Sequence, residues 1–358
     1  MIVRILAAAL AAFVLSAVPA AAFPVGERDL MATSPTAALR DAQHRSTVRV
    51  TVWYPAAPGA REVPLTIGPP DKPLFVSGSA APDAPFADGK RRPIVLFSHG
   101  FGGTARMMGW FGTALAEAGY VVVAVDHPGN NGRDPMTLAG ATLFWDRPGD
   151  LRVALAKVEA DPDIAPHLYA SRLAVAGFSA GGFTALASAG AKVDLPQLEA
   201  FCRDNPADGV CAPQKEFPVT QAQAEAALKT PALAAQRARA DGVHAVPGVK
   251  AVFVMAPAIV QAFDPASLQM FTTPVAIVLG SADRVAPPRT NGLFAAHRIP
   301  NAELTELAGV GHYDFLARCT DAGDATVPLC RTKEPKGVTH RAAIGAALAF
   351  LGHTIGAP

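Results

Sequence analysis

The pentapeptide Gly177-Phe178-Ser179-Ala180-Gly181 has the pattern G-x-S-x-G. It directly follows a short apolar run, Leu173-Ala174-Val175-Ala176, and precedes small residues that favour a helix. A strand, a tight turn and a helix around this pattern predict a nucleophile elbow, which presents the serine hydroxyl at the edge of a sheet. The flanking glycines leave room where a Cβ would clash. Ser179 is therefore the predicted nucleophile, and a chance glycine-serine turn is the alternative.

Apolar runs of strand length alternate with segments of helical periodicity along most of the chain. Mostly apolar runs are typical of strands buried on both faces, and they occupy residues 94–98, 120–125, 250–255 and 275–279. Helical spacing covers residues 105–118, 150–160 and 341–351, and Asp150 is expected to cap the second of these helices. This alternation predicts a mostly parallel central sheet with helices on both faces.

Two segments depart from this alternation. Residues 56–92 are rich in proline and glycine, which predicts a long connection with at most one short strand near residues 74–76. Residues 194–248 hold two cysteines and an alanine- and glutamine-rich stretch, 221–240, with high helix propensity. We interpret residues 194–248 as a small helical insertion that caps the site.

A serine hydroxyl needs a base to take its proton and an acid to orient that base. Asp283 follows the apolar run 275–279, and His312 lies in the glycine-flanked stretch Gly309-Val310-Gly311-His312-Tyr313. Both positions predict loops at the carboxyl ends of strands, where ligands gather in open α/β sheets. We predict that Ser179, Asp283 and His312 act together. Asp264 and Asp314 are alternative acids.

The remaining machinery is expected from backbone groups and aromatic walls. Backbone N–H groups stabilise the oxyanion in acyl transfer, and the predicted donors belong to Ala180 and to Phe101 in His99-Gly100-Phe101-Gly102-Gly103. This chemistry requires no metal or cofactor. Large aromatic side chains near these motifs are expected to form the substrate-binding walls, namely Trp110, Trp145 and Phe178.

Composition limits the partners and the compartment. The chain has 358 residues and a net charge of +1, so no basic surplus favours nucleic acid. Residues 1–22 begin with a positive charge, continue with a short apolar run and end in Ala20-Ala21-Ala22, which predicts a signal peptide cleaved before Phe23. An uncleaved anchor is the alternative. The mature domain, 23–358, is expected to be periplasmic or secreted, without stable membrane insertion.

The four cysteines fit an exported protein. They allow three pairings, of which the local pairs Cys202–Cys211 and Cys319–Cys330 are the simplest. Cysteines in an oxidising compartment usually form disulfides, and the C-x-x-C spacing common in zinc sites is absent. We therefore predict two structural disulfides, with free thiols as the alternative.

The chain resembles the α/β-hydrolase superfamily, in particular the predicted dienelactone hydrolases and the similar platelet-activating-factor acetylhydrolases. The resemblance rests on motifs that cover most of residues 48–190 and 250–352, namely Val52-Trp53-Tyr54-Pro55, Ser98-His99-Gly100-Phe101-Gly102-Gly103, Val125-Asp126-His127-Pro128-Gly129, Gly177-Phe178-Ser179-Ala180-Gly181-Gly182 and Gly311-His312-Tyr313-Asp314-Phe315-Leu316. It implies an α/β-hydrolase fold and hydrolysis of short acyl esters.

Two departures from this group affect the expected chemistry. True dienelactone hydrolases have a cysteine where this chain has Ser179. The plasma acetylhydrolases place their acid where this chain has Met255-Ala256-Pro257, which leaves the role to Asp283. The predicted activity is that of an exported serine esterase on small-molecule esters. The alternatives are a peptidase or amidase of the same fold, and a secreted binding protein without catalysis.

Overall fold

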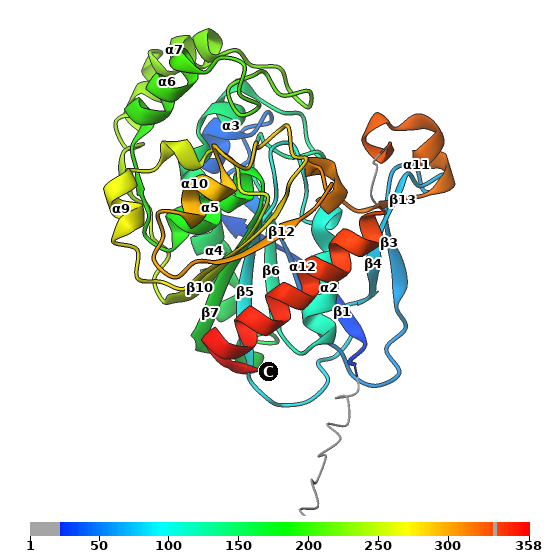
Figure 1. Ribbon diagram of the computed structural model, residues 1–358. Coiled ribbons are helices and arrows are strands. Elements are labelled where there is room, and N and C mark those ends of the chain that lie inside the picture. Colours follow the sequence, from blue (N-terminus) through cyan, green and yellow to red (C-terminus); the bar gives the residue numbers. More distant parts are fainter. Residues whose placement is uncertain (1–21, 332–334) are drawn as a thin grey trace, which may run out of the picture.

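The computed structural model describes residues 22–331 and 335–358 (Figure 1). Apart from Ala22, the predicted signal peptide lies outside the described residues. Among the helices of the described ranges, none has both the length and the apolar character needed to cross a bilayer.

Within the described residues, eleven strands form one sheet, in the order β12-β11-β10-β7-β5-β6-β2-β1-β4-β13, with β3 paired to β4. The last strand, β13, is Arg318–Cys319. The six strands from β12 to β6 are parallel, as the apolar runs predicted. They are β5 (Arg92–Ser98), β6 (Val121–Asp126), β7 (Leu168–Phe178), β10 (Val249–Met255), β11 (Val275–Gly280) and β12 (Glu303–Leu307). Their carboxyl ends therefore meet at one edge of the sheet, where loops can combine into a site.

The other side of the sheet is mixed. Strand β2 (Thr47–Pro55) is antiparallel to β6, and β1 (Val25–Thr33) is antiparallel to β2. Residues 56–92 were expected to be almost irregular, but they contain β3 (Val63–Ile67) and β4 (Phe75–Pro82). Proline- and glycine-rich composition hid these strands because β4 pairs with β1, far away in sequence, and with β3 across a loop.

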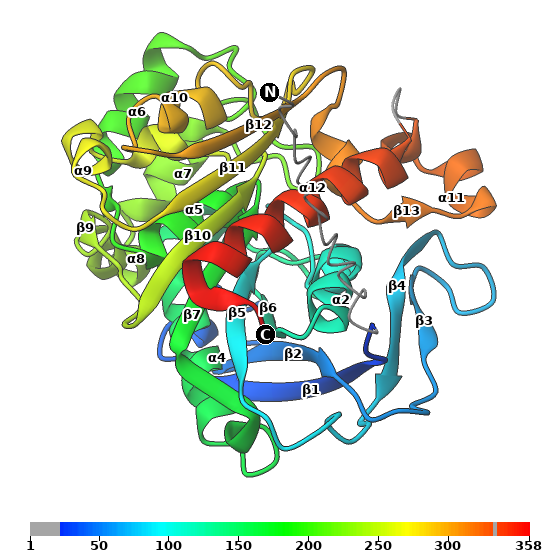
Figure 2. The same cartoon turned by 60° about the horizontal axis from the view of Figure 1, so that its bottom comes forward.

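Helices cover both faces of the sheet (Figures 1 and 2). Helices α2 (Gly109–Glu117) and α12 (Lys336–Leu351) pack on one face, and α4 (Arg147–Glu159) and α5 (Ala180–Ser188) pack on the other. Helix α4 begins three residues before Asp150, so the predicted capping role of Asp150 is wrong. The Asp150 carboxylate lies inside the helix. It can be fully buried because Arg40 provides an opposite charge, as described below.

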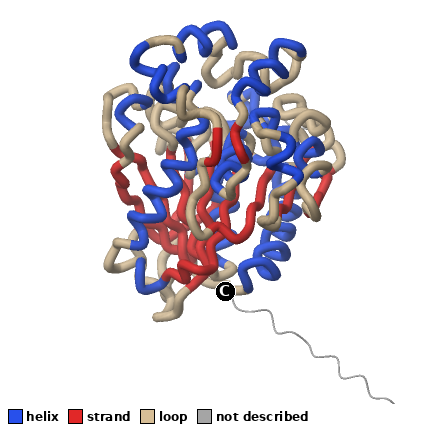
Figure 3. Tube along the Cα trace, turned by 90° about the vertical axis from the view of Figure 1, so that its left-hand side faces the viewer, coloured by secondary structure: helices blue, strands red, loops and turns tan. Residues whose placement is uncertain are grey.

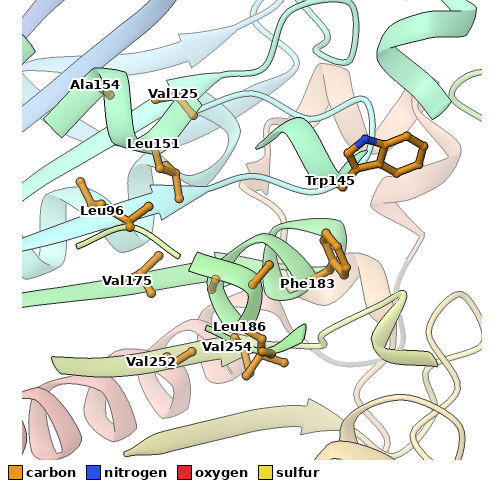
Figure 4. Packing of buried hydrophobic residues seen from close by; sticks show 14 of the residues in the cluster. Leu96, Val125, Trp145, Leu151, Ala154, Val175, Phe183, Leu186, Val252 and Val254 are labelled. Carbon is orange, nitrogen blue, oxygen red and sulfur yellow. The ribbon is translucent and has the colours of Figure 1, made fainter. Parts of the chain in front are cut away.

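The core under α4 and α5 connects the sheet to the functional edge. Side chains of the central strands, such as Leu96, Val175 and Val254, contact Leu151 and Leu186 of these helices in one buried cluster (Figure 4). At the end of the same cluster lie the aromatic rings of Trp145 and Phe183, both almost fully buried (Figure 4). Burial of this apolar surface is the main term that stabilises the sheet–helix layers.

Residues 194–248 form a helical segment beside the carboxyl edge of the sheet (Figures 1 and 3). It contains α6 (Leu195–Asp204), α7 (Gln221–Leu228) and α8 (Pro231–Arg237), so the predicted helical stretch 221–240 is split in two. The split falls at Thr230-Pro231, because proline favours the first turn of a new helix. We call residues 194–248 the insertion.

Both local cysteine pairs predicted from the sequence are confirmed. Cys202–Cys211 joins the end of α6 to the loop that follows it within the insertion, and Cys319–Cys330 closes a loop that contains α11 (Asp321–Thr326). Neither bond crosses between distant parts of the chain. Each therefore stabilises one local loop rather than the whole sheet.

Candidate active site

The predicted strand–turn–helix context of Ser179 is confirmed. Ser179 lies between the last residue of β7 and the first residue of α5, with φ 55° and ψ −121°. A non-glycine residue rarely adopts a positive φ, and its cost is tolerated where the surroundings hold it. A Cβ at Gly177 would overlap the carbonyl oxygen of Gly181, and a Cβ at Gly181 would overlap that of Ser98. The two glycines of the motif therefore allow the turn to close.

Ser179, His312 and Asp283 form a continuous chain of hydrogen bonds. Nε2 of His312 lies 2.8 Å from Oγ of Ser179, and Nδ1 lies 2.6 Å from Oδ2 of Asp283. A carboxylate only accepts hydrogen bonds, so Nδ1 carries the proton and Nε2 is free to accept the serine proton. Oδ1 of Asp283 accepts from the backbone N–H groups of Val285 and Ala286, both at 2.8 Å. The acid is thus held in position on both of its oxygens.

The alternative acids lie elsewhere. Asp264 caps helix α9 (Pro265–Gln269) by accepting from the N–H of Ala266. Asp314 is close in sequence to His312, but its Oδ2 accepts from the N–H of Gly311. Of Asp264, Asp283 and Asp314, only Asp283 is hydrogen-bonded to the His312 ring.

The predicted oxyanion donors flank Ser179. Ala180 is the first residue of α5, so its N–H has no helical carbonyl to bind. The loop after β5 lies directly against Ser179, because a Cβ at Gly100 would be 3.1 Å from Cβ of Ser179. Phe101 follows Gly100 and contributes to the walls of the two cavities at Ser179, which are described below. The glycine at position 100 is what permits this close approach.

The orientation of the Phe101 N–H is fixed by the carbonyl group of the same peptide unit. In a trans peptide the two groups point in opposite directions, and the described residues contain no cis bond. The Gly100 carbonyl oxygen lies 2.6 Å from Nδ1 of His99 and accepts from the N–H of Gly103 at 3.2 Å. Nε2 of His99 accepts from the N–H of His127, so Nδ1 is the protonated nitrogen. The His99 side chain therefore sets the direction of the Phe101 N–H.

A buried polar network lies beneath this loop. Nε2 of His127 is 2.9 Å from Oγ of Ser98, and Nδ1 is 2.8 Å from Oδ2 of Asp150. Arg40 donates two hydrogen bonds to the same carboxylate, at 2.6 and 2.8 Å. Burial lowers the pKa of His127 to about 3, so its ring is neutral. Burial alone would raise the pKa of Asp150, but Arg40 and His127 outweigh it and hold that pKa well below its ordinary value.

Two cavities meet at Ser179. The larger, of about 200 Å³, lies between the insertion and the sheet edge and includes Trp145 and Ala180 in its walls. The smaller, of about 100 Å³, includes Phe178 and His312. Ser179 and Phe101 belong to both. Ser179 is therefore open to two adjoining spaces, of which only the smaller has His312 in its wall.

A family model described as "Alpha/beta hydrolase family" matches residues 95–327, about two thirds of the chain. The chain belongs to the alpha/beta hydrolase family. Among solved structures, this alpha/beta hydrolase is similar to the ferulic acid esterase from Streptomyces cinnamoneus, with 19% sequence identity and a TM-score of 0.60. That match covers 94% of this chain and 92% of the other, and it shows that the two share a fold. A comparison with curated proteins finds no match.

The three predicted wall residues of this hydrolase have different places. Trp145 lines the larger cavity, and Phe178 lines the smaller cavity with its ring centroid 4.9 Å from that of His312. Trp110 lines neither, so its prediction as a wall is wrong. Its indole stacks on the ring of His340 of α12, with 3.7 Å between the ring centroids, and donates a hydrogen bond to the carbonyl oxygen of Phe315. Trp110 thus joins helices α2 and α12 in the core.

Several residues of the site escaped the sequence analysis. Glu216 of the insertion lines the smaller cavity and accepts from the hydroxyl of Tyr313 at 3.2 Å. No pattern could have placed Glu216 there, because it lies in an irregular loop. His99 and His127, by contrast, stand inside the quoted motifs, and two histidines next to buried strand ends were a usable signal.

Potential metal ligands gather at one place in the described residues, at Cys319, Asp324 and Cys330. The two sulfurs there are joined in a disulfide, so they are not available as thiolate ligands. This group lies on the loop closed by that disulfide and contributes no residue to either cavity described above.

His340 should make the protein less stable in acid. Burial lowers its pKa to about 4, whereas a histidine of the unfolded chain titrates near 6.5. Between these two values the unfolded chain binds a proton that the folded protein does not, so the free energy of unfolding falls as the pH falls, by up to about 1.4 kcal/mol per pH unit. We expect His340→Phe, which keeps a ring against Trp110, to reduce this slope. Urea unfolding at several pH values between 4 and 7 would measure it.

The matched control is His297→Phe, because His297 is exposed. It should leave the slope as in the unmodified protein. An equal slope in the His340→Phe variant would contradict the assignment of this acid sensitivity to His340.

Proposed function

We propose that the protein is an exported serine hydrolase that cleaves carboxylic esters. The observation that carries this proposal is the hydrogen-bond chain from Ser179 through His312 to Asp283, with distances of 2.8 and 2.6 Å. These distances lie within the reach required for proton transfer between a nucleophile, a base and an orienting acid. Membership of the alpha/beta hydrolase family supports the same reaction class.

The reaction proceeds through an acyl-enzyme. Oγ of Ser179 attacks the ester carbonyl carbon while Nε2 of His312 takes its proton, and Asp283 stabilises the resulting imidazolium. The oxyanion accepts from the N–H groups of Phe101 and Ala180. His312 then gives the proton to the leaving alcohol as the ester bond breaks. In the second half, water attacks the acyl carbon while its proton passes to Nε2 of His312. His312 then returns this proton to Oγ of Ser179 as the acyl–oxygen bond breaks, which releases the acid and a free Ser179.

The larger cavity supports a preference for short acyl chains. Its volume of about 200 Å³ is below the range of about 300–1,000 Å³ common for sites that enclose drug-sized ligands. We propose that the insertion is a cap and that it limits the acyl chain from above. This preference agrees with the resemblance to platelet-activating-factor acetylhydrolases seen in the motifs.

Export is the second part of the proposal. Residues 1–22 carry the features of a signal peptide, and the two disulfides, Cys202–Cys211 and Cys319–Cys330, need an oxidising compartment to persist. The domain 23–358 would then work in the periplasm or outside the cell on small-molecule esters.

A chain-length series of p-nitrophenyl esters tests the proposed function. We expect kcat/KM to be highest for acetate to butyrate and to fall by about tenfold or more at octanoate and beyond, because the larger cavity cannot enclose a long chain. The release of p-nitrophenol by the purified domain measures this directly. A fluorophosphonate should label Ser179 in the same preparation.

Two results would count against the proposal. A rate that rises steadily to long chains would exclude the short-acyl preference, and a protein that neither turns over esters nor reacts with the fluorophosphonate would be a binding protein. Comparing a p-nitrophenyl ester with the matching p-nitroanilide separates esterase from amidase activity, and we expect the ester to be preferred.

A further inference from the structure

The two cavities at Ser179 have different access to the group that donates the proton. The leaving alcohol must lie beside Nε2 of His312, because that atom protonates it as the ester bond breaks. His312 lines only the smaller cavity and Ala180 lines only the larger, while Phe101 lines both. On the proposed function, the acyl group therefore occupies the larger cavity and the leaving alcohol occupies the smaller.

The smaller cavity carries a negative charge from the insertion. Glu216 lies between the loop of residues 99–103 and the loop that holds His312. Its Cβ would be 2.9 Å from a Cβ at Gly102, and its Oε1 accepts from the hydroxyl of Tyr313 at 3.2 Å. Tyr313 directly follows His312, and the centroids of the two rings are 5.6 Å apart. Glu216 is an exposed residue, and this hydrogen bond places its carboxylate beside the space where the alcohol leaves.

We propose that Glu216 makes the enzyme select leaving alcohols by their charge. Cationic and uncharged alcohols are favoured over anionic ones. This inference rests on the proposed ester hydrolysis and assigns the substrate class of the smaller cavity.

The chemistry of this wall agrees with the proposal. The structure gives Oε2 of Glu216 no hydrogen-bond partner among the described residues, so it can accept from a hydroxyl of the alcohol or lie beside a cation. Among residues 22–331 and 335–358, no arginine or lysine lines this cavity to offset the carboxylate. Burial and the nearby Glu216 raise the pKa of Tyr313, so its hydroxyl remains a donor to Glu216 across the working pH range. A second carboxylate in this space would meet an uncompensated like charge.

Three propionate esters with different alcohols test this inference: propionylcholine, ethyl propionate and the propionate ester of glycolic acid. Their acyl group is the same, and their alcohols are cationic, uncharged and anionic. Proton release at constant pH gives kcat/KM for the unmodified protein and for Glu216→Gln. We expect Glu216→Gln to lower the choline-to-glycolate ratio of kcat/KM by about tenfold. In the unmodified protein the carboxylate attracts the cationic alcohol and repels the anionic one, and the variant loses both effects. Ethyl propionate should change by less than about twofold.

Two controls separate this effect from a general one. Glu225→Gln makes the same chemical change at the wall of the larger cavity and should leave the choline-to-glycolate ratio unaltered. Ethyl hemisuccinate and ethyl butyrate differ in the charge of the acyl group instead of the alcohol. The ratio of their kcat/KM values should be the same for the unmodified protein and for Glu216→Gln.

The outcomes distinguish this inference from the proposed function. If all three esters are hydrolysed and Glu216→Gln leaves their ratio unchanged, the role of Glu216 is refuted while the esterase stands. If Glu216→Gln changes the hemisuccinate-to-butyrate ratio instead, the two cavities have been assigned in the wrong order. If no ester is hydrolysed and the fluorophosphonate does not react, both proposals fail.

Discussion

Replacing Ser179 with alanine is expected to lower kcat for ester hydrolysis by about 10⁴- to 10⁶-fold, the range found when a serine nucleophile is removed from such a site. The substitution removes the oxygen that is hydrogen-bonded to Nε2 of His312. The oxyanion donors and the cavities stay in place, so a small residual rate and ordinary substrate binding should persist. Steady-state kinetics with p-nitrophenyl acetate would measure the loss.

The same variant should remain folded. Alanine tolerates a positive φ no worse than serine, and the backbone of residue 179 is held by hydrogen bonds with Met255 and Ala258. A melting temperature within a few degrees of that of the unmodified protein would exclude unfolding as the cause of the lost activity. Turnover by the alanine variant at a rate comparable with that of the unmodified protein would refute Ser179 as the nucleophile.

Replacing Asp150 with alanine is expected to lower the free energy of unfolding by about 3–5 kcal/mol, as for a buried ion pair that loses one partner. The guanidinium of Arg40 would stay buried without its hydrogen-bonded carboxylate, and Nδ1 of His127 would lose its acceptor. The N–H of His127 binds His99, which orients the Phe101 peptide. Activity should therefore fall as well, even at temperatures where the variant is folded.

Urea unfolding of this variant beside Asp163→Ala would measure the difference. Asp163 also forms an ion pair, with Arg28, but its side chain is 70% exposed. A surface pair of this kind contributes about 0–1 kcal/mol, so the control should be nearly as stable as the unmodified protein. Equal stability of the two variants would show that the buried pair is not what holds this region together.

The parts of the fold that depend on local pattern were predictable. The central parallel strands are mostly apolar because helices cover them on both sides, and the elbow is determined by two glycines within five residues. Strands β3 and β4 were largely missed because their pairing with β1 and with each other is set by distant partners, and β-propensity depends strongly on such context. Asp150 was misread as a cap because its true partner, Arg40, is 110 residues away.

The candidate site divides in the same way. Ser179, Asp283 and His312 follow strands in a fixed order, and the topology of a parallel sheet brings such positions to one edge. The walls could not be assigned from residue type alone. Trp110 and Trp145 are both buried aromatic residues near a motif, yet only Trp145 lines a cavity. Glu216 has no sequence signal at all, because its position depends on how the insertion folds back over Gly102.

The separate origins of the reacting groups and of the cavity walls bear on how this enzyme could be re-engineered. The groups that react come from the sheet edge and are supported from below by His99 and His127, whereas much of the walls comes from one connection between β7 and β10. Exchanging only the insertion within that connection for one of another length leaves Ser179, Ala180 and the order of the strands untouched. On the proposed function, we therefore expect libraries confined to residues 194–248 to change substrate choice while Ser179, Asp283 and His312 stay constant.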